Sequence, residues 1–401
     1  MYPNLYFIIK KLTGWTPPEF LAAFQTYGLF LAITFIVGGY IVFMELGRKH
    51  KAGLIPQIKL VHRRVNVLDG ILNALIGFIL GYKVGHIYNN YDAFIDNPQN
   101  IVFSANGNWT AGIVLAIVFA GVKVWEWYSQ RNDKSPIKEE WVDPQNTIGD
   151  LVIVAAISGI IGSKVMALLE VWDEFLKNPV QMLFDGSGIA IYGGLIGGFI
   201  GVYFYARSRN FKMLHLMDAA APALLLGYGT GRMGCHFSGD GDWGIINETA
   251  KPFSWLPDWM WSYNYPNNVM GASASTLDEA GRKLSAVPMG DCGGFAETFP
   301  KYCFELPKGV YPTSVYETLI MVVAFAIFWW VLRKRINIAG LLFFFYLIVN
   351  GMERFWIERF RVNDRYSEFF DFSQAQIIAV TLFTIGAIGS AWLIWQHKKR
   401  V

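Results

Sequence analysis

Two arginines and a glutamate share one face of an apolar segment near the C-terminus. Arg354, Glu358 and Arg361 are spaced i, i+4 and i+7, which places them on one side of a helix. Two positive groups and one negative group predict a site with spare positive charge, suited to an anion. The alternative is an Arg354–Glu358 ion pair that only neutralises itself for insertion into a membrane. Glu317, directly after Pro312-Thr-Ser-Val-Tyr316, begins another apolar run and could orient such arginines.

A third arginine lies in a glycine-rich stretch in the middle of the chain. Arg232 stands in Gly229-Thr-Gly-Arg-Met-Gly234 and is followed by Cys235-His-Phe-Ser-Gly-Asp-Gly-Asp-Trp-Gly244. Glycines allow the backbone to approach a ligand closely and allow a helix to break inside a protein. An arginine in that setting can direct two N–H donors onto a phosphate. The alternative is a helix end whose arginine extends to the membrane surface.

Other ionisable residues lie inside apolar segments, where a charge at mid-bilayer costs at least about 2.5–3.5 kcal/mol. Lys123, Glu126 and Asp218 lie near segment ends, and there snorkelling explains them. Lys83 and Lys164 lie deeper and are either functional or structural partners of carboxylates.

Small residues dominate the stretch Gly188-Ile-Ala-Ile-Tyr-Gly-Gly-Leu-Ile-Gly-Gly198. Glycines at close spacing allow helices to pack tightly in lipid, which is a sufficient reason for Gly193 and Gly194. Tyr192 beside them either presents its hydroxyl to a cavity or anchors the helix at the membrane interface.

The composition indicates which kind of protein must position these side chains. The 401 residues are 53% hydrophobic and only 16% charged, against roughly 25% charged in an average soluble protein. A compact soluble domain could not bury that much apolar surface. This excludes a disordered chain, a disulfide-rich miniprotein and an ordinary cytosolic enzyme. The net charge of +3 is too small to indicate nucleic-acid binding, and three cysteines provide neither a disulfide framework nor a metal motif.

Apolar runs of roughly 20 residues, the length that crosses a bilayer as a helix, recur along the chain. The sequence therefore predicts an all-α polytopic membrane protein with a single integral membrane domain, residues 1–401, and about nine transmembrane helices. The predicted spans are 20–46, 70–89, 110–128, 150–171, 188–206, 215–234, 314–332, 339–358 and 375–396.

Loops that are rich in lysine and arginine alternate with loops that are poor in them, and this alternation predicts the orientation of the chain. The loop 47–68 is strongly basic and the loop 90–109 holds no lysine or arginine. With nine spans, the N-terminus lies outside and the C-terminus lies in the cytoplasm. The loop 359–374 is assigned outside yet contains Arg359, Arg361 and Arg365. Either the topology is wrong there or these arginines have a role other than orientation.

Two further features concern the organisation of the chain. Residues 69–88 align with 150–169 at an offset of 81, which indicates either a duplication or a chance likeness between glycine- and isoleucine-rich helices. The hydrophilic region 235–313 is predicted to face outside, where disulfides form. Cys292 and Cys303 in that region are either bonded to each other or two free thiols.

These elements, in this order, resemble the prolipoprotein diacylglyceryl transferase family. The resemblance covers roughly residue 150 to the end, plus the first span. It rests on Tyr27-Gly28-Leu29, Gly193-Gly-Leu-Ile-Gly197, Gly231-Arg232-Met-Gly234 with Gly239 and Trp243-Gly244, Pro312-Thr-Ser-Val-Tyr316-Glu317, and Arg354-Phe355, Glu358, Arg361 and Asp364. Family members usually have seven spans, so the resemblance implies that residues 69–140 contain extra spans.

The resemblance implies a reaction, its partners and its location. The diacylglyceryl group of phosphatidylglycerol is transferred to the thiol of a lipobox cysteine in a prolipoprotein, a thioether forms and glycerol-1-phosphate leaves. No cofactor and no metal are implied. The protein would be a multi-pass enzyme of the bacterial plasma (inner) membrane, in contact with membrane lipids and the signal-peptide region of its substrate.

The resemblance also implies roles for individual residues. Arg232 would bind the phosphate, and Arg354, Glu358 and Arg361 would act on the headgroup and leaving group. The substrate-binding residues would further include Tyr27, Gly193, Gly194, Asp240, Tyr316 and Glu317. Asp240 would replace an acidic residue of the family, at a spacing that differs by one.

The sequence departs from the family pattern at the candidate base. Many members have histidine where this chain has Tyr192, and tyrosine is a poor base unless arginines stabilise its phenolate. His236 and Glu358 are the alternative bases, so the identity of the base stays open. Two other functions compete with the transferase: a small-solute transporter, suggested by the repeat and the glycine-broken helices, and an inactive relative that only binds lipid or lipoprotein.

Overall fold

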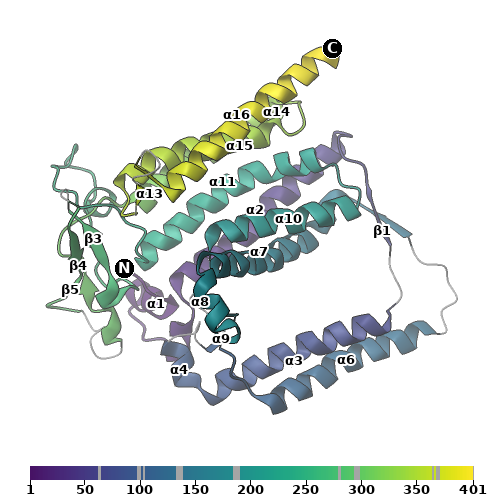
Figure 1. The fold of residues 1–401 in the computed structure, drawn as a ribbon, viewed down its shortest axis with the longest axis horizontal. Coiled ribbons are helices and arrows are strands. Elements are labelled where there is room, and N and C mark those ends of the chain that lie inside the picture. The colour runs from purple at the N-terminus through teal and green to yellow at the C-terminus, as the bar shows by residue number, and fades with distance from the viewer. Residues whose placement is uncertain are drawn as a thin grey trace. The chain divides into compact units, whose positions relative to one another are not determined.

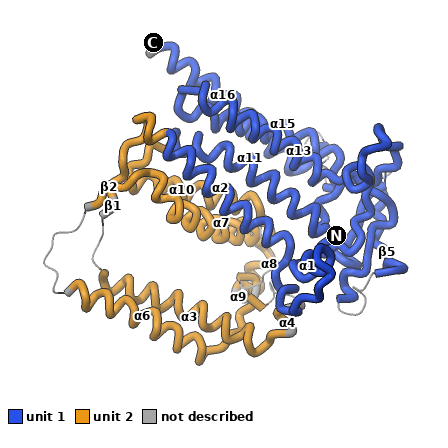
Figure 2. Tube along the Cα trace, turned by 180° about the vertical axis from the view of Figure 1, so that it is seen from behind, with its two compact units in different colours: residues 1–48, 214–401 blue, residues 49–213 orange. Residues whose placement is uncertain are grey.

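The computed structural model describes most of the chain as two compact units (Figure 2). One unit comprises residues 1–48 and 214–401, and the other comprises residues 49–213. The described residues are 1–61, 65–96, 101–102, 104–131, 139–183, 190–278, 281–292, 299–363, 365–366 and 371–400. The prediction of one integral domain over residues 1–401 stays a prediction.

The first unit contains most of the long helices of the C-terminal half (Figure 1). Its helices are α1 (Leu5–Thr13), η1 (Glu19–Ala23), α2 (Thr26–Lys51), α11 (Met213–Ser238), α13 (Thr313–Ala326), the π-helical turn η6 (Ile327–Leu332), α14 (Arg333–Arg335), α15 (Leu341–Ile357), η7 (Glu358–Phe360) and α16 (Gln374–Arg400). The region after α11 adds η3 (Asp258–Met260), η4 (Gly271–Ser273), η5 (Pro300–Tyr302), β3 (Ser275–Leu277), β4 (Lys283–Ser285), β5 (Val287–Pro288) and β6 (Phe304–Glu305), and β7 (Arg365–Tyr366) pairs with β8 (Phe372–Ser373) before α16.

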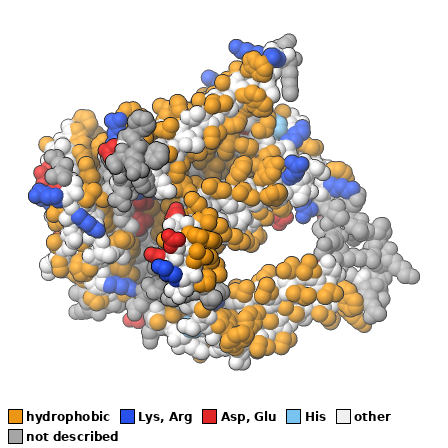
Figure 3. Space-filling view, viewed as in Figure 1, with side chains coloured by type: hydrophobic (Ala, Val, Ile, Leu, Met, Phe, Trp, Pro, Cys, Tyr) orange, Lys and Arg blue, Asp and Glu red, His pale blue; other side chains and the backbone are white. Residues whose placement is uncertain are grey.

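Each of the nine predicted spans is mostly helical over its described residues. Within the described ranges, six helical stretches are long and apolar enough to cross a membrane: Thr26–Lys51, Val67–Asn89, Trp109–Gln130, Pro144–Glu170, Thr313–Arg335 and Gln374–Lys399. Figure 3 shows hydrophobic side chains covering much of the helical surface, as lipid contact requires. The remaining three are α10 (Ile191–Ser208), α11 and α15; α10 and α15 have 18 and 17 residues, below the roughly 20 that a bilayer requires. A mostly helical polytopic membrane protein is therefore confirmed, whereas nine as the number of spans stays a prediction.

The core of the first unit forms where α11, α13 and α15 meet. Leu225 of α11, Met321 of α13 and Leu342 of α15 are buried in one apolar cluster. Helix α11 is joined to α13 at Gly229, whose carbonyl oxygen accepts a hydrogen bond from the Thr318 hydroxyl at 3.0 Å. This contact places the last turns of α11 beside the first turns of α13.

Helix α15 is anchored at its start to α11 and further along to α16. At its start, the buried Asp218 of α11 accepts hydrogen bonds from the backbone N–H of Gly340 at 2.8 Å and of Phe343 at 3.1 Å. A carboxylate at that position stabilises a helix by satisfying its free N–H groups. Asp218 is therefore structural, as expected, although it caps a helix rather than extending to the surface. Further along, Gly351 packs against the Ala379 carbonyl and Phe383 of α16.

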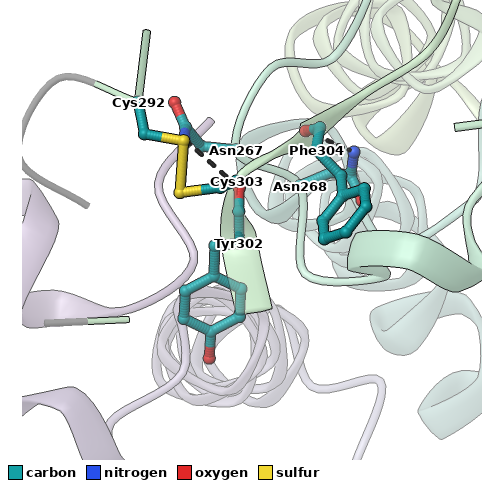
Figure 4. Close-up of a disulfide and its surroundings, with 6 residues drawn as sticks. All are labelled: Asn267, Asn268, Cys292, Tyr302, Cys303 and Phe304. Atoms are coloured by element: carbon teal, nitrogen blue, oxygen red, sulfur yellow. Dashed lines mark hydrogen bonds between the residues drawn. A yellow bond between two sulfur atoms is a disulfide. The ribbon is translucent and has the colours of Figure 1, made fainter. Parts of the chain in front are cut away.

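The hydrophilic region that follows α11 has a small core of its own. Trp243, Tyr265, Leu306 and Val310 are buried together, and two short hairpins, β3–β4 and β5–β6, extend from this core. A disulfide joins Cys292 to Cys303, with their Cα atoms 5.5 Å apart (Figure 4). Beside it, Asn267 and Asn268 donate side-chain hydrogen bonds to the carbonyl oxygens of Tyr302 and Phe304, both at 3.2 Å. Of the two alternatives for these cysteines, the bonded one is correct.

The second unit is built from two antiparallel helical hairpins. Its elements are β1 (Ile58–Val61), α3 (Val67–Asn89), α4 (Tyr91–Asp96), α6 (Trp109–Arg131), β2 (Glu139–Val142), η2 (Pro144–Thr147), α7 (Ile148–Glu170), α8 (Trp172–Lys177), α9 (Pro179–Leu183) and α10. Helix α3 packs along α6, and α7 packs along α10. Strand β1 pairs antiparallel with β2.

The two hairpins have the same packing, which supports the interpretation of the repeat as a duplication. A Cβ on Gly81 of α3 would overlap the Ala111 carbonyl oxygen of α6, and a Cβ on Gly162 of α7 would overlap the Gly193 carbonyl oxygen of α10. Gly81 and Gly162 are aligned at the offset of 81. The start of the second helix is also tied to the first helix by a similar hydrogen bond in both hairpins. Asn108 N donates to the Tyr82 carbonyl oxygen, and Ala190 N donates to the Ser163 carbonyl oxygen.

Two lysine positions in this unit have structural partners. Lys83 Nζ donates to the carbonyl oxygens of Ser104 and, at 3.0 Å, Asn106, so it ties the connecting loop back onto α3. Lys123 pairs with Glu126 at 2.6 Å on the same helix. Both interactions agree with structural rather than functional roles.

Tight glycine packing predicts an asymmetric response to alanine substitution in the first hairpin. Gly81→Ala is expected to lower the free energy of unfolding by about 1–3 kcal/mol, because the new methyl group forces α6 away. Gly121→Ala on α6 is the matched control, since a Cβ there meets nothing within 4 Å. Thermal unfolding of the detergent-solubilised variants measures both. Equal behaviour of the two variants would contradict the packing described here.

Candidate functional site

Four elements of the first unit bring the candidate site together. Arg232 lies near the end of α11, Glu317 lies in the second turn of α13, and Arg354 lies in the last turn of α15. Glu358 begins η7, and Arg361 follows it directly. These five predicted residues form one ion-pair network, although up to 129 positions separate them in the sequence.

Glu317 is the centre of this network. Its fully buried carboxylate contacts Arg232 Nε at 2.5 Å, Arg361 Nη1 at 3.1 Å and Arg354 Nη1 at 3.5 Å. The hydroxyl of Tyr228, one helical turn before Arg232, donates to Glu317 Oε2 at 3.1 Å. Three guanidinium groups from different elements therefore converge on one carboxylate, which holds them in fixed positions.

Asp242 adds a second bridging carboxylate. One of its oxygens accepts from Arg232 Nη1 and the other from Arg361 Nη2. Its backbone carbonyl accepts hydrogen bonds from Thr313 Oγ1 at 3.0 Å and Ser314 Oγ at 2.7 Å, both in the first turn of α13. Burial raises the pKa of Asp242, but the two arginines more than offset this effect and lower the pKa to about 2. Asp242 is therefore ionised at any physiological pH.

Glycines make this return of the chain possible. Gly239 and Gly241 have φ values of 66° and 100°, a region that side chains with a Cβ rarely adopt. These two residues reverse the chain after α11, so that Asp242 comes back to Arg232. Behind it, Ile245 N donates to the Phe360 carbonyl oxygen at 2.8 Å, which fixes the backbone beside Arg361.

Glu358 holds the other side of the network. It contacts Arg354 Nη2 at 2.9 Å, so the ion pair that the sequence left as the alternative to an anion site is present. Its second oxygen accepts from Ser373 Oγ at 2.9 Å and from the side chain of Asn363. The carboxylate is thus committed to positioning Arg354 and joining η7 to the start of α16.

The charge balance corrects one expectation. Arg354, Glu358 and Arg361 alone predicted spare positive charge, but Glu317 and Asp242 supply two more carboxylates, so that three arginines face three paired acids. What remains is directional hydrogen-bonding capacity. Among the described residues, Arg354 Nη1 and Arg361 Nε are buried without a hydrogen-bond acceptor. An anion with several oxygens would satisfy such donors.

Three predicted substrate-binding residues lie near this network. Tyr316 is next to Glu317, and its hydroxyl is buried with no hydrogen-bond partner in the described part of the chain. Tyr27 of α2 packs on Gly234, close to the end of α11, and is half-exposed. Asp240 lies within 4.8 Å of Asp242 and Cys235 rather than pairing with an arginine, and burial together with Asp242 raises the pKa of Asp240.

His236 lies among aromatic rings. Its Nδ1 is 3.1 Å from the Tyr265 hydroxyl, and its ring contacts those of Trp259, Tyr263 and Tyr265. Burial lowers the pKa of His236 to about 4, so the ring is neutral. Among the described residues, His236 makes its polar side-chain contact with Tyr265 and not with the ion-pair network.

Tyr192, Gly193 and Gly194 belong to the second unit, whereas the ion-pair network belongs to the first. All three begin α10 in the second unit, and the two glycines pack against Gly162, Ser163 and Met166 of α7. This matches the helix-packing interpretation of the glycine run. Asp364, part of the resemblance, lies outside the described residues.

Three members of the site were missed in the sequence. Asp242 was passed over in favour of Asp240, although both belong to the same Gly-Asp-Gly-Asp run. Tyr228 precedes Arg232 by four residues, a helical spacing that places both on one face. Glu353, beside Arg354, is buried at 6% exposure and stands out as a carboxylate in an apolar span.

Comparisons with known proteins show the family to which the chain belongs. The sequence model of the family described as prolipoprotein diacylglyceryl transferase matches residues 109–392. A phosphatidylglycerol–prolipoprotein diacylglyceryl transferase of Dehalococcoides mccartyi is 27% identical over 257 residues, which cover 64% of this chain and 79% of the relative. Proteins of the same name from Lysinibacillus sphaericus and Geobacillus kaustophilus are 26% and 27% identical, over 61% and 64% of this chain and 75% and 79% of their own lengths. The matched range includes the whole ion-pair network and begins inside residues 69–140.

Proposed function

Because this chain belongs to the prolipoprotein diacylglyceryl transferase family, we propose that it transfers the diacylglyceryl group of phosphatidylglycerol to the lipobox cysteine of prolipoproteins. The reaction joins the cysteine sulfur to the glyceryl carbon as a thioether and releases glycerol-1-phosphate. The observation that carries this proposal is the convergence of Arg232, Arg354 and Arg361 on Glu317, with buried N–H donors still unsatisfied.

The arginines serve the phosphate of the lipid. Arg354 Nη1 and Arg361 Nε are buried donors without acceptors among the described residues, and phosphate oxygens would accept from them. As the glyceryl C–O bond breaks, negative charge grows on the phosphate. Donors already aimed at that charge stabilise the transition state more than the ground state.

The carboxylates keep the arginines in place. Three guanidinium groups at this distance would repel one another, and their burial among lipid tails would be costly without partners. Glu317, Asp242 and Glu358 neutralise them and lock their orientation. Binding of the lipid then requires little rearrangement, since the donors are already oriented.

We further propose a plasma-membrane location with the N-terminus outside, the C-terminus in the cytoplasm and nine spans. The disulfide between Cys292 and Cys303 supports an outside position for residues 235–313, because such bonds persist in oxidising surroundings. Two arginines that contradicted the orientation have other roles: Arg361 belongs to the network, and Arg359 lies over the Trp356 ring at 4.6 Å. Residues 69–140 contain the extra spans, formed by duplication of the hairpin.

The transporter alternative expects equivalent halves around a shared site. The network instead lies wholly in the first unit, whereas both copies of the repeat lie in the second. The other alternative is an inactive relative that only binds lipid or lipoprotein. The assay that tests for transferase activity also tests this alternative.

The test is mass spectrometry of a lipobox peptide incubated with the purified protein in liposomes that contain phosphatidylglycerol. A peptide with an added diacylglyceryl mass and equimolar glycerol phosphate is expected. A peptide with serine in place of the cysteine is the control and should stay unmodified. An unmodified cysteine peptide, under conditions in which a relative from another bacterium modifies it, would refute the transferase.

A further inference from the structure

The transfer requires a group that removes the proton of the acceptor thiol, because a thiol with a pKa near 8.5 is mostly protonated at neutral pH. The identity of this proton acceptor rests on the proposed function. Of the bases considered from the sequence, Tyr192 is a poor base unless arginines stabilise its phenolate, and His236 contacts Tyr265 in an aromatic cluster.

The carboxylates of the ion-pair network are also committed. Glu317 is shared by three arginines and Tyr228. Glu358 binds Arg354, Ser373 and Asn363, and Asp242 bridges two arginines. A proton on any of these would break the contacts that hold the guanidinium groups.

Glu353 differs from all of them. It lies on α15 directly before Arg354, is buried, and neither of its carboxylate oxygens accepts a hydrogen bond from the described residues. Tyr228 faces it, but the single proton of that hydroxyl goes to Glu317. Both oxygens of Glu353 therefore keep lone pairs with which to take a proton.

The surroundings of Glu353 are those of the proposed reaction centre. The charged groups that face it are Glu317 of α13, Arg232 of α11 and its own neighbour Arg354. Helix α16, which packs along α15, has no charged side chain before its last turn. A buried carboxylate within a span has a cost that selection for stability alone would not maintain, which favours a functional role.

We propose that Glu353 is the base that accepts the proton of the lipobox thiol. One oxygen of Glu353 takes the proton from sulfur, and the sulfur attacks the glyceryl carbon that bears the phosphate. The C–S bond forms as the C–O bond breaks, and the electron pair of that bond leaves on the phosphate oxygen beside Arg354. The proton then passes from Glu353 to the released glycerol phosphate, which restores the carboxylate.

The test compares a thiol with a selenol acceptor. Glu353→Gln keeps the shape of the side chain and removes the base. We expect it to slow transfer to a cysteine lipobox peptide by about a hundredfold or more. A selenocysteine peptide is ionised at neutral pH without a base, so the variant should modify it at nearly the rate of the unsubstituted protein. The residual thiol rate should rise with pH as the thiol ionises by itself.

Three companion variants make the result specific. Arg354→Ala should lose activity toward both peptides, since it removes a phosphate donor. Met352→Leu, on the exposed neighbouring position of α15, should change neither rate. Glu353→Asp keeps a carboxylate one methylene further back and should retain part of the thiol rate, which also covers the case in which the glutamine variant does not fold.

Each other outcome overturns the assignment in a recognisable way. An undiminished thiol rate in Glu353→Gln, or an equal loss with both peptides in both Glu353 variants, would refute the base role while the transferase function stands. No product from either peptide with the unsubstituted protein would refute the transferase function itself, and the base role with it.

Discussion

Arg232→Ala is expected to reduce diacylglyceryl transfer by at least about a hundredfold, the loss typical of one well-placed donor to a developing negative charge. Arg232 is the only arginine of the described network on α11, and it bridges Glu317 and Asp242. Without it, the phosphate loses a positive neighbour and two carboxylates face the site with reduced compensation. Initial rates with phosphatidylglycerol liposomes and a lipobox peptide measure the loss.

Two further variants separate catalysis from folding. Arg232→Lys retains the charge but not the two-pronged geometry, so it should recover only a small part of the rate. Arg282→Ala removes an exposed arginine that pairs with Asp278 on the surface, and it should leave the rate unchanged. Transfer by Arg232→Ala at close to the normal rate would remove Arg232 from the phosphate site.

Glu317→Gln is expected to have the largest effect on stability of any single substitution in the network. The fully buried carboxylate compensates three guanidinium groups, and its loss leaves them with Asp242 and Glu358 alone. Removing one partner from a buried ion pair typically costs about 3–5 kcal/mol of unfolding free energy. Activity should fall in parallel, because the arginines lose the contact that orients them.

Unfolding in detergent, followed by heat or denaturant, measures this cost. Glu248→Gln is the matched control: Glu248 is an exposed carboxylate paired with Lys308, and its substitution should leave the unfolding midpoint almost unchanged. A second check is Arg232→Ala combined with Glu317→Gln, whose cost should be less than the sum of the two single costs. Strict additivity would show that Arg232 and Glu317 are not energetically coupled.

Much of the fold was predictable because it depends on local patterns. Apolar runs located every long helix, since the bilayer requires roughly 20 apolar residues for a span. The spacing of Arg354 and Glu358 predicted that they share one helix face, because residues four apart are neighbours on any helix. The offset of 81 left a duplication and a chance likeness open, and the glycine contacts of Gly81 and Gly162 show similar hairpin packing twice.

The site itself was only partly predictable. The choice between Asp240 and Asp242 depended on how Gly239 and Gly241 turn the chain, which residue types alone do not specify. The charge balance was misjudged because Glu317 and Asp242 come from other elements. His236 was a reasonable candidate base until its burial beside Tyr265 was known.

The residue order of this chain was therefore enough to predict a helical membrane protein, an internal likeness at an offset of 81 and a group of arginines suited to phosphate. Only the tertiary structure decided that Arg232, Arg354 and Arg361 meet at one carboxylate and that Glu353 accepts no hydrogen bond from the described residues. The physical reason is range. Helix periodicity and hydropathy act over a few turns, whereas the convergence of side chains over more than a hundred positions depends on how whole helices pack.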